Sequence, residues 1–386
     1  MVEPRHRDRV LGALLGVAAG DCLGAPLTGL NAATIRERHG IVSTYLDERP
    51  IWSSVTQQSL TLVEATVRCG SPDPSWVGGR WIEMAAASEG LPHGTHRCAH
   101  PAFAESIGAL RTGGDWRSCG SAEQAGCANV ARIVPIATAL GHEPDDVVAA
   151  MIVDVSLVTH RELRAISAAL AAGWLATRLR REPGYPVPAA RGRSMLEELA
   201  AWLRKREESL ISEIEGIRVA SPSHVHDVSI VLGGLARRFD EGWPAERGWV
   251  ERYASARLGR PAHATESCAL CVVPAAIAVV LGSERRFEET LVSAVSLGHD
   301  TAVMGALVGG LAGAAAGVAA IPARWRRIEG WEPLMAWGDA LACCTASDVA
   351  LSPTARGFPG PESLPDVLEL ERQLSLLAES ERTARA

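Results

Sequence analysis

The sequence predicts an all-α protein. Hydrophobic residues recur at helical spacing nearly everywhere, for example at Leu60 and Val63, whereas the alternation typical of strands is scarce. Aromatic residues make up only 5% of the 386 residues. Apolar residues reach 47% and charged residues 22%, which is typical of a globular protein with a sizeable core.

The same spacing places helices along the chain, and two of them carry an unusual pattern. The clearest stretches lie at 10–24, 60–66, 133–140, 166–179, 271–281 and 303–321. Glycine occupies every fourth position in the first and the last of these, at Gly12, Gly16, Gly20 and Gly24 and at Gly305, Gly309, Gly313 and Gly317. Each glycine costs roughly 1 kcal/mol relative to alanine inside a helix, so a stripe of four needs a reason.

Close approach of two backbones is such a reason, because a face without side chains lets a neighbouring helix come near. We therefore predict that the two glycine-rich helices are central and tightly packed against neighbours, one arrangement being against each other. The alternative is that a glycine- and alanine-rich coding bias produced the spacing by chance. Its occurrence in two separate helices argues against chance.

The main domain is predicted to span residues 1–350, with a helical insertion at about 185–225. Residues 181–193 are rich in proline, glycine and arginine and indicate a surface connection, after which residues 194–217 are typical of an exposed, charged helix.

Residues 351–386 form a further segment, in which a proline- and glycine-containing linker precedes an amphipathic helix. Val367, Leu370, Leu374 and Leu377 give this helix one apolar stripe. We expect the stripe to dock on the protein's own body. The alternative is docking on a second subunit, which would make the protein a homodimer.

Charge and cysteine content exclude some function classes. A net charge of −7 and a pI near 5.9 leave no basic excess to neutralise phosphates, so no nucleic-acid partner is expected. The nine cysteines lack the spacing of a disulfide framework, and Cys268-x-x-Cys271 has no second pair to complete a tetrahedral metal site. Core thiols in a reducing cytoplasm explain them better, so we expect a cytoplasmic protein.

Two apolar runs imitate membrane signals. Residues 10–19 follow basic residues, as in a signal peptide, but acidic residues interrupt that basic region, and Asp21 follows without a persuasive cleavage site. Residues 303–321 are long enough to span a bilayer, yet glycine and alanine dominate them. We predict that both are core helices and that the protein has no membrane partner.

Five ordered segments carry a resemblance to a known family. They are Val10-Leu-Gly-Ala-Leu-Leu-Gly-Val-Ala-Ala-Gly-Asp-Cys-Leu-Gly-Ala25, Trp52-Ser-Ser-Val-Thr-Gln-Gln-Ser-Leu60, Ala131-Arg-Ile-Val-Pro135, Thr159-His160 and Ala294-Val-Ser-Leu-Gly-His-Asp-Thr-Ala-Val-Met-Gly-Ala-Leu307. Together they resemble the ADP-ribosylglycohydrolases, the family that includes dinitrogenase-reductase-activating glycohydrolase and the J1 crystallins. The resemblance implies a compact orthogonal bundle of helices and spans roughly residues 8 to 330.

The resemblance also implies a site at two helix N-termini. The family hydrolyses N- or O-linked ADP-ribose with two Mg²⁺ or Mn²⁺ ions, which Thr-Asp-Asp-Thr and Asp-Thr-Asp-Thr motifs hold. The corresponding residues here are Ser53, Ser54, Val55 and Thr56, and Asp300, Thr301, Ala302 and Val303; a glutamate that assists in some members aligns near Thr28. Because one carboxylate cannot balance two divalent cations, we expect no metal cofactor and no ordinary two-metal hydrolysis.

Three residues at this site are candidates for catalysis. Asp300 could cap the following helix, react, or do both. His299 replaces a family glycine and could serve as acid or base, or be a partly exposed loop residue. His160 belongs to a retained Thr-His pair that resembles a ligand-lining position, but could equally be a hydrogen-bonded core histidine.

The candidate ligand-binding residues are taken from the same motifs: Asp21, Thr28, Ser53, Ser54, Thr56, Asn129, Arg132 and Thr301. Asp21 is expected to cap or brace helices, and Arg132 either contacts an anionic group or pairs with a buried acid. Asn129 closes an altered nucleotide-contact loop. Two histidine clusters are candidates for a metal site only as the lesser alternative: His93, His96 and His100, and His224 with His226.

Without metals, free N–H groups at the two helix N-termini could bind an anion or a polar small molecule directly. The function first predicted is thus a metal-independent enzyme that acts on a metabolite derived from NAD, ribose or a nucleotide in a bacterial pathway, with His299 and Asp300 as acid and base. The first alternative is a catalytically inactive protein that binds ADP-ribose or a nucleotide. The second is a residual hydrolase with one rebuilt metal site made of Asp300 and a histidine.

Overall fold

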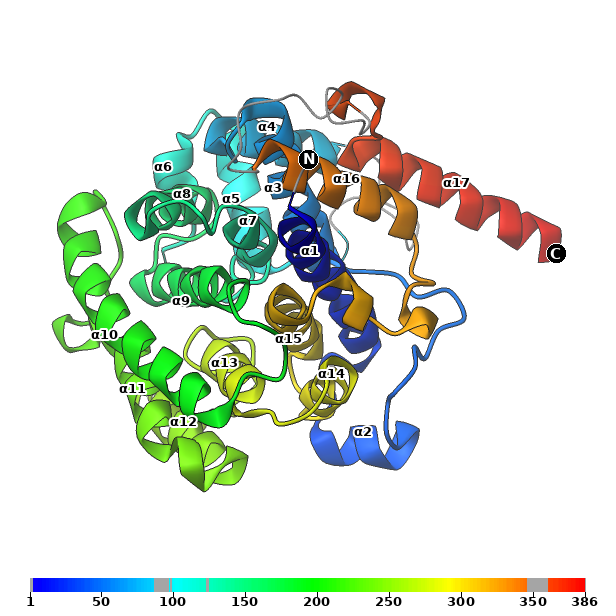
Figure 1. Ribbon diagram of the computed structural model, residues 1–386. Coiled ribbons are helices and arrows are strands. Elements are labelled where there is room, and N and C mark those ends of the chain that lie inside the picture. The colour runs from blue at the N-terminus through cyan, green and yellow to red at the C-terminus, as the bar shows by residue number, and fades with distance from the viewer. Residues whose placement is uncertain (1–2, 87–96, 98, 123–124, 346–359, 386) are drawn as a thin grey trace.

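The protein is all-α, as predicted. The computed structural model describes residues 3–86, 97, 99–122, 125–345 and 360–385 (Figure 1). These residues contain no β-strand; they form isolated bridges, such as the one between Asn31 and Gly298. Of the first histidine cluster, His93 and His96 lie outside the described residues, as do residues 351–359 of the expected linker.

The helices run through the whole described chain. The α-helices are α1 (Pro4–Gly24), α2 (Ala32–His39), α3 (Ser54–Cys69), α4 (Pro74–Ala86), α5 (Pro101–Arg111), α6 (Trp116–Cys119), α7 (Ile133–Ala139), α8 (Asp145–Leu157), α9 (Leu163–Leu179), α10 (Ala189–Glu213), α11 (Asp227–Arg238), α12 (Trp243–Leu258), α13 (Val272–Gly282), α14 (Phe287–Val295), α15 (Thr301–Ala316), α16 (Trp331–Cys344) and α17 (Val367–Arg385). Short 3₁₀ turns are η1 (Ala25–Leu27), η2 (Pro222–His224), η3 (Phe239–Glu241), η4 (Val318–Ala320), η5 (Ala323–Trp325) and η7 (Pro361–Ser363).

The two glycine-rich helices, α1 and α15, pack against each other in antiparallel fashion at the centre of the molecule (Figure 1). A Cβ atom added to Gly16 would lie 2.2 Å from the carbonyl oxygen of Gly309, and one added to Gly20 would lie 2.0 Å from that of Gly305. The stripes therefore exist because the two backbones touch, and the predicted central packing is confirmed. Helices α7, α9, α13, α14 and α16 surround the pair.

Helix α10 differs from its prediction at both ends. It begins at Ala189, inside the segment predicted to be a surface connection, and ends at Glu213. The arginines of this segment are good helix formers, and Pro188 stands just before the first turn, where its lack of an N–H is harmless. The helix is also less exposed than predicted, because its apolar face, including Met195 and Leu199, is buried against α9, α11 and α13.

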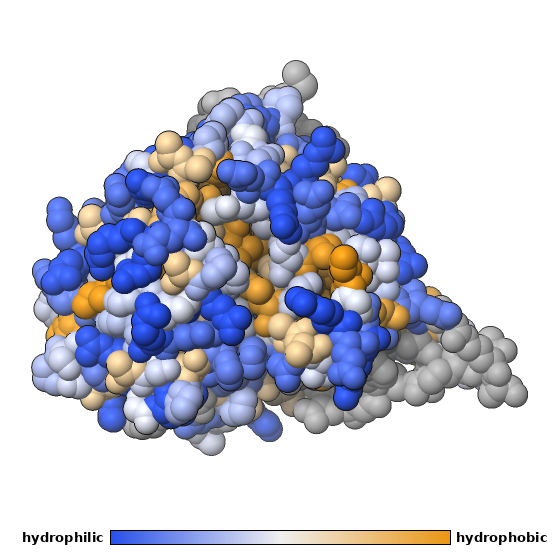
Figure 2. All heavy atoms as spheres, turned by 90° about the horizontal axis from the view of Figure 1, so that it is seen from below, coloured by the Kyte–Doolittle hydropathy of each residue, from blue (hydrophilic) through white to orange (hydrophobic). Residues whose placement is uncertain are grey.

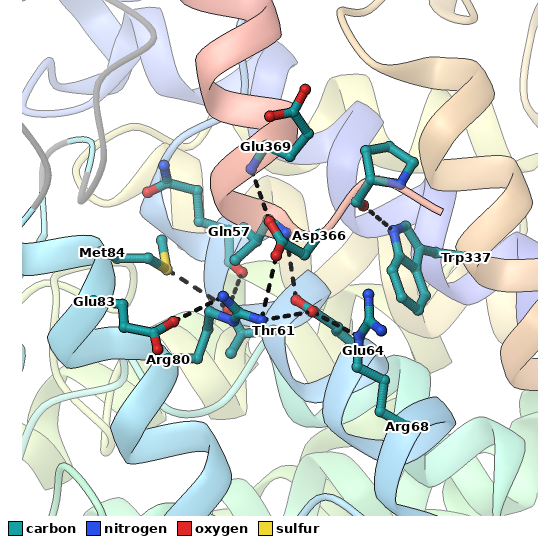
Figure 3. Close-up of polar contacts among 12 residues, drawn as sticks. Gln57, Thr61, Glu64, Arg68, Arg80, Glu83, Met84, Trp337, Asp366 and Glu369 are labelled. Carbon is teal, nitrogen blue, oxygen red and sulfur yellow. Dashed lines mark hydrogen bonds and ion pairs between the residues drawn. The ribbon is translucent and has the colours of Figure 1, made fainter. Parts of the chain in front are cut away.

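Helix α17 docks on the protein's own body through the first half of its stripe. Val367, Leu370 and Leu374 are buried, whereas Leu377 is 54% exposed and the end of the helix projects from the body (Figure 1). Figure 3 shows the polar contacts at its start: Glu64 accepts a hydrogen bond from the Val367 N–H at 3.3 Å, and Asp366 pairs with Arg80 at 3.4 Å. Docking on this chain is thus the arrangement that the structure contains.

One helical stretch, Pro4–Leu27, is apolar and long enough to cross a membrane, with a mean hydropathy of 1.7 over its most apolar window. That window is 89% buried inside the protein, as a core helix would be. Seen from below the view of Figure 1, the surface is mostly hydrophilic, with apolar residues gathered near the middle of the face (Figure 2).

Candidate functional site

Three helix N-termini meet at one cavity of about 560 Å³. Ser53 and Ser54 approach it from the start of α3, His100 from the start of α5, and Asp300 with its neighbours from the start of α15. Thr28, after the end of α1, and the loop at residues 266–267 complete the wall. Of the predicted site residues, the structure brings Thr28, Ser53, Ser54, His299 and Asp300 together at this cavity.

Asp300 is both the cap of α15 and part of the cavity wall. Its Oδ1 accepts the Val303 N–H at 3.3 Å, and its Oδ2 accepts a long hydrogen bond of 3.7 Å from the Cys127 thiol. Its own N–H donates to the Thr265 carbonyl at 3.0 Å. Asp300 therefore caps α15 through one carboxylate oxygen and is at the same time a lining residue of the cavity.

His299 is the one residue other than glycine with a positive φ among the described residues, at 65°. Its N–H donates to the Leu30 carbonyl at 2.7 Å, and its carbonyl accepts the Gly29 N–H at 2.8 Å. The imidazole stacks on His263, with 4.3 Å between the ring centroids. Burial, and then the proximity of His263, lowers the pKa of His299, so its ring is neutral at pH 7.

The threonines between α1 and α15 are mostly engaged with the protein itself. The hydroxyl of Thr301 donates to the Gly24 carbonyl at 2.7 Å and so binds the end of α1 rather than lining the cavity. Thr28 accepts the Ala302 N–H at 3.2 Å and also faces the cavity. Of this pair, only Thr28 is placed to contact a ligand.

Asp21 organises the start of α3 from inside the core. Its Oδ2 accepts the Ser53 N–H at 2.9 Å, the Thr56 N–H at 3.2 Å and the Thr56 hydroxyl at 2.7 Å. Burial raises the pKa of this carboxyl, against the opposing effect of those hydrogen bonds. Asp21 and Thr56 do not line the cavity, and the brace predicted for Asp21 is what the structure contains.

These contacts change the expected picture of the helix N-termini. The Ser54 N–H donates to the Arg97 carbonyl at 2.9 Å and the Val55 N–H to the Ser53 hydroxyl at 3.2 Å. Together with the two donors that bind Asp21, the first N–H groups of α3 are therefore occupied. The free N–H groups that the sequence led us to expect at α3 are not present, because Asp21, the Arg97 carbonyl and the Ser53 hydroxyl accept their hydrogen bonds.

Three predicted residues lie behind the cavity wall. Arg132 is fully buried and donates to Gln58 at 2.7 Å and to the Thr159 hydroxyl at 2.8 Å, so it positions the cavity residue Gln58 rather than reaching a ligand. Burial lowers the pKa of Arg132 to about 9. Asn129, also fully buried, donates to the Ala165 carbonyl at 3.1 Å.

His160 is fully buried as well, and its Nδ1 lies 2.8 Å from the Thr159 hydroxyl. Burial, and then the charge of Arg132, keeps its pKa well below the ordinary range. Its Nε2 has no hydrogen-bond partner among the described residues and does not belong to the cavity wall. Of the two interpretations of His160, these contacts match the hydrogen-bonded core histidine and not the ligand-lining residue.

His100 and Glu266 line the cavity, although the sequence analysis did not assign them to this site. His100 caps α5, its Nδ1 accepting the Ala102 N–H at 3.2 Å; burial lowers its pKa, and the carboxylate of Asp300 opposes that shift. Glu266 pairs with Arg260 at 2.7 Å. A histidine directly before Pro101 was a usable signal for a helix start, but nothing local indicated which site it would face.

The second histidine cluster lies elsewhere. His226 is 3.4 Å from the carboxylate of Glu207, and His224 is 3.9 Å from that of Asp227, where α10 meets α11. Neither histidine lines the cavity.

A separate group of possible metal ligands lies beside the cavity residue Glu266. One oxygen of Glu266 and the sulfurs of Cys268 and Cys271 lie within 4.8 Å of one another, a donor set suited to a single thiophilic cation such as Zn²⁺.

Comparison with known proteins agrees with this geometry. A model of the family described as ADP-ribosylglycohydrolase matches residues 2–349. The chain belongs to the ADP-ribosylglycohydrolase family. A solved structure titled "ADP-ribosylglycohydrolase-related protein complex" is similar at 25% identity with a TM-score of 0.63, covering 89% of this chain and all of that one. Among curated proteins, none matches significantly.

The two metals implied by the ADP-ribosylglycohydrolase resemblance do not fit the residues present. Val55, Ala302 and Val303 line the cavity at positions where the family motifs have oxygen ligands, and valine and alanine offer none. The hydroxyls of Thr56 and Thr301 are turned to Asp21 and to a backbone carbonyl. Asp300 is then the one carboxylate among the eight motif positions, which is too little negative charge for two divalent cations.

Proposed function

We propose that this ADP-ribosylglycohydrolase-family protein binds a small, hydroxyl-bearing metabolite of the ribose or nucleoside class. We further propose that it acts on this metabolite without the family's metal pair, with His299 as the acid–base group and the Asp300 carboxylate as the group that stabilises developing positive charge. The observation that carries the proposal is that a neutral imidazole and a carboxylate face one cavity in which Ser54, Val55 and Ala302 stand where the motifs have their other acidic ligands.

The charge of the cavity favours a neutral ligand over an anionic one. The titratable groups among its described lining residues are Asp300, Glu266, His100 and His299, and none of those described residues is an arginine or a lysine. The lowered pKa values of both histidines keep their rings uncharged at pH 7. A phosphate would therefore meet negative charge without a cationic partner, whereas a sugar hydroxyl can donate to the carboxylates.

Hydroxyl side chains support the same ligand class. Thr28, Ser53, Ser54 and Ser267 line the cavity and can each donate and accept hydrogen bonds. Val55 lies beside them and can pack against the apolar face of a ring. A mixture of a few polar groups with apolar walls is typical of small-molecule sites of this volume.

Each of the two reactive groups has a distinct role in this proposal. A neutral imidazole with a lowered pKa accepts a proton, so His299 takes one from the water molecule that adds to the sugar carbon and returns it to the leaving group, whose bond to that carbon breaks. Asp300, held at the start of α15, faces the positive charge that develops when a bond at a sugar carbon breaks. The positive φ of His299 fits such a role, because strained residues that persist in a fold are concentrated at functional sites.

A binding protein without turnover is the second candidate. The observation that favours it is the replacement of the motif's ligand positions by Val55, Ala302 and Val303, which removes the family's known source of catalytic power. The two candidates differ in one respect only: both expect a ligand in the cavity, and only the first expects a product.

The test begins with a thermal-shift screen of ribose, adenosine, NAD and ADP-ribose, each with and without Mg²⁺. We expect the uncharged compounds to raise the melting temperature, with no dependence on Mg²⁺. Turnover of each binder is then followed by mass spectrometry. Magnesium-dependent release of ADP-ribose from a modified protein would disprove the proposal.

Two matched variants separate catalysis from folding. Asp300→Asn keeps a side-chain oxygen to cap α15, and His299→Gly suits the positive φ at that position. Both are expected to fold and to bind ligand while losing at least about a hundredfold in turnover, as is usual when a general acid or base is removed. Undiminished turnover in both variants would exclude the proposed roles, and binding without any product in the wild type would favour the second candidate.

A further inference from the structure

A second cavity, of about 600 Å³, lies between α12, α13 and α14. It shares no lining residue with the candidate functional site. Trp243 and Glu246 approach it from the first turns of α12, Val279 from α13, and Leu297 from the turn after α14. The volume is in the range of sites that hold small molecules.

Glu246 is the unusual feature of this cavity. Its side chain lines the wall, the residue is only 3% exposed, and its Oε1 has no hydrogen-bond partner within the described part of the chain. Burial alone raises its pKa to about 7, since no neighbouring charge or hydrogen bond contributes to the shift. A buried carboxylate without a partner is costly unless a proton or a cation neutralises it.

The other groups around the cavity do not supply that cation. Arg285, on the segment between α13 and α14, also lines the wall, but its guanidinium donates to Ser293 at 2.7 Å. Glu284, on the same segment, is exposed and adds negative charge. The aromatic rings of Phe239 and Trp243 and the aliphatic side chains of Val279 and Leu297 provide apolar walls beside the carboxylate.

We propose that this cavity is a binding site for a small organic ammonium ion, in which the carboxylate of Glu246 pairs with the charged nitrogen and the aromatic walls hold an apolar body. An N–H⁺ group would donate a charge-assisted hydrogen bond to this carboxylate, and such a bond is about twice as strong as a neutral one. Aromatic faces attract cations and apolar rings alike. The site is independent of the function proposed for the first cavity.

The probe pair for the test is phenethylamine and its neutral counterpart 2-phenylethanol, with binding measured by ligand-observed NMR and calorimetry up to millimolar concentration. The amine is expected to bind, and the alcohol is expected to bind at least tenfold more weakly. Glu246→Gln should reduce amine affinity by at least tenfold, and circular dichroism checks that the variant is folded. Glu284→Gln is the matched control at the exposed rim of the same cavity and should retain most of the affinity.

Two further arms make the result decisive. Affinity should fall about tenfold from pH 8 to pH 6, because the fraction of ionised Glu246 falls by that factor around a pKa of about 7. Asp300→Asn should leave amine binding unchanged, since Asp300 belongs to the other cavity. Equal affinity for amine and alcohol, an unchanged affinity in Glu246→Gln, or no binding of the amine at all would each overturn the proposal.

Discussion

At position 299 a histidine occupies a backbone conformation that suits glycine. The left-handed region costs an L-residue roughly 1–2 kcal/mol, and two backbone hydrogen bonds to the turn after α1 hold it there. Gly298 beside it also has a positive φ, and a Cβ there would lie 2.7 Å from the Leu30 carbonyl oxygen. The chain thus retains a reactive side chain at a position where glycine would be more stable.

The matched pair His299→Gly and His299→Ala measures this strain directly. Both variants lose the imidazole and its stacking on His263, but only glycine suits the positive φ. The glycine variant is therefore expected to exceed the alanine variant by about 1 kcal/mol in free energy of unfolding, measured by urea denaturation. Equal stability of the two variants would mean that the backbone at 299 is not strained.

At the scale of the element, the contact between α1 and α15 leaves no room for any side chain at the glycine stripes. A Cβ at Gly12 would lie 2.3 Å from the Gly313 carbonyl oxygen, so the closeness extends along most of both helices. The cavity of the candidate site lies where this pair ends, after α1 and at the start of α15. Any change in the spacing of the two helices is therefore transmitted to Thr28 and Asp300.

Gly16→Ala is expected to lower the free energy of unfolding by about 3 kcal/mol or more, because the new methyl group would lie 2.2 Å from a backbone oxygen that cannot move alone. The control is Gly79→Ala, on the exposed face of α4, where a Cβ meets nothing within 4 Å. That variant should gain about 0.5–1 kcal/mol from the helix propensity of alanine. Chemical denaturation monitored by circular dichroism compares the two, and a tolerated Gly16→Ala would refute the close packing.

Helix α17 is a second element whose contacts reach the site. Glu371 pairs with Arg97 at 2.8 Å, and both side chains are buried. The Arg97 carbonyl in turn accepts the Ser54 N–H at the start of α3. The C-terminal helix therefore supports Arg97, whose carbonyl helps to hold one wall of the candidate cavity.

Glu371→Ala should cost about 3–5 kcal/mol, since it leaves the Arg97 guanidinium buried beside Trp52 without its carboxylate. Glu369→Ala is the matched control on the same helix, because Glu369 pairs with Arg372 in solvent and its removal should change stability little. The two are compared by thermal and urea unfolding. Similar losses of stability in both variants would show that the buried Glu371–Arg97 pair contributes no more to stability than the exposed Glu369–Arg372 pair.

At the scale of the whole molecule, helical periodicity and the glycine spacing were sufficient to predict the class of fold and the central packing of the two glycine-rich helices, with their mutual contact as one of the arrangements considered. The cavity was predicted only in part, because its described lining residues come from six separate segments. His100 and Glu266 carry no local sign of their neighbours, and two of the N–H groups at the start of α3 are filled by Asp21, which is 32 residues away from Ser53. Contacts between residues far apart in the chain leave no periodic pattern in the sequence, so a sequence pattern cannot predict them.

Stability of the whole molecule should fall as the solution becomes alkaline. Burial raises the pKa of Glu207 from its ordinary 4.5 to about 8, against the opposing hydrogen bonds from Ser229. Because the folded pKa exceeds the unfolded one, this group's favourable contribution is complete below about pH 4.5 and is lost as the pH rises through 8. At about 1.4 kcal/mol for each unit, the loss is a few kcal/mol.

The measurement is the free energy of unfolding at pH 5, 7 and 9. The wild type should lose stability across this range, and Glu207→Gln, which stays neutral, should lose much less of it. Glu208→Gln changes an exposed neighbour on the same helix and is the control. A wild type that is equally stable at pH 5 and pH 9 would contradict the raised pKa of the buried carboxyl.

The pairing of α1 with α15 also has a consequence for biosynthesis. The first helix ends at Gly24 and its partner spans Thr301–Ala316, so the ribosome must translate the whole intervening segment and the partner helix before the two can meet. At a translation rate of roughly 5–20 residues per second, the apolar first helix remains without its partner for roughly 15–60 seconds. During that interval we expect a chaperone to bind the apolar first helix. Slower translation of the segment between the two helices would prolong this requirement.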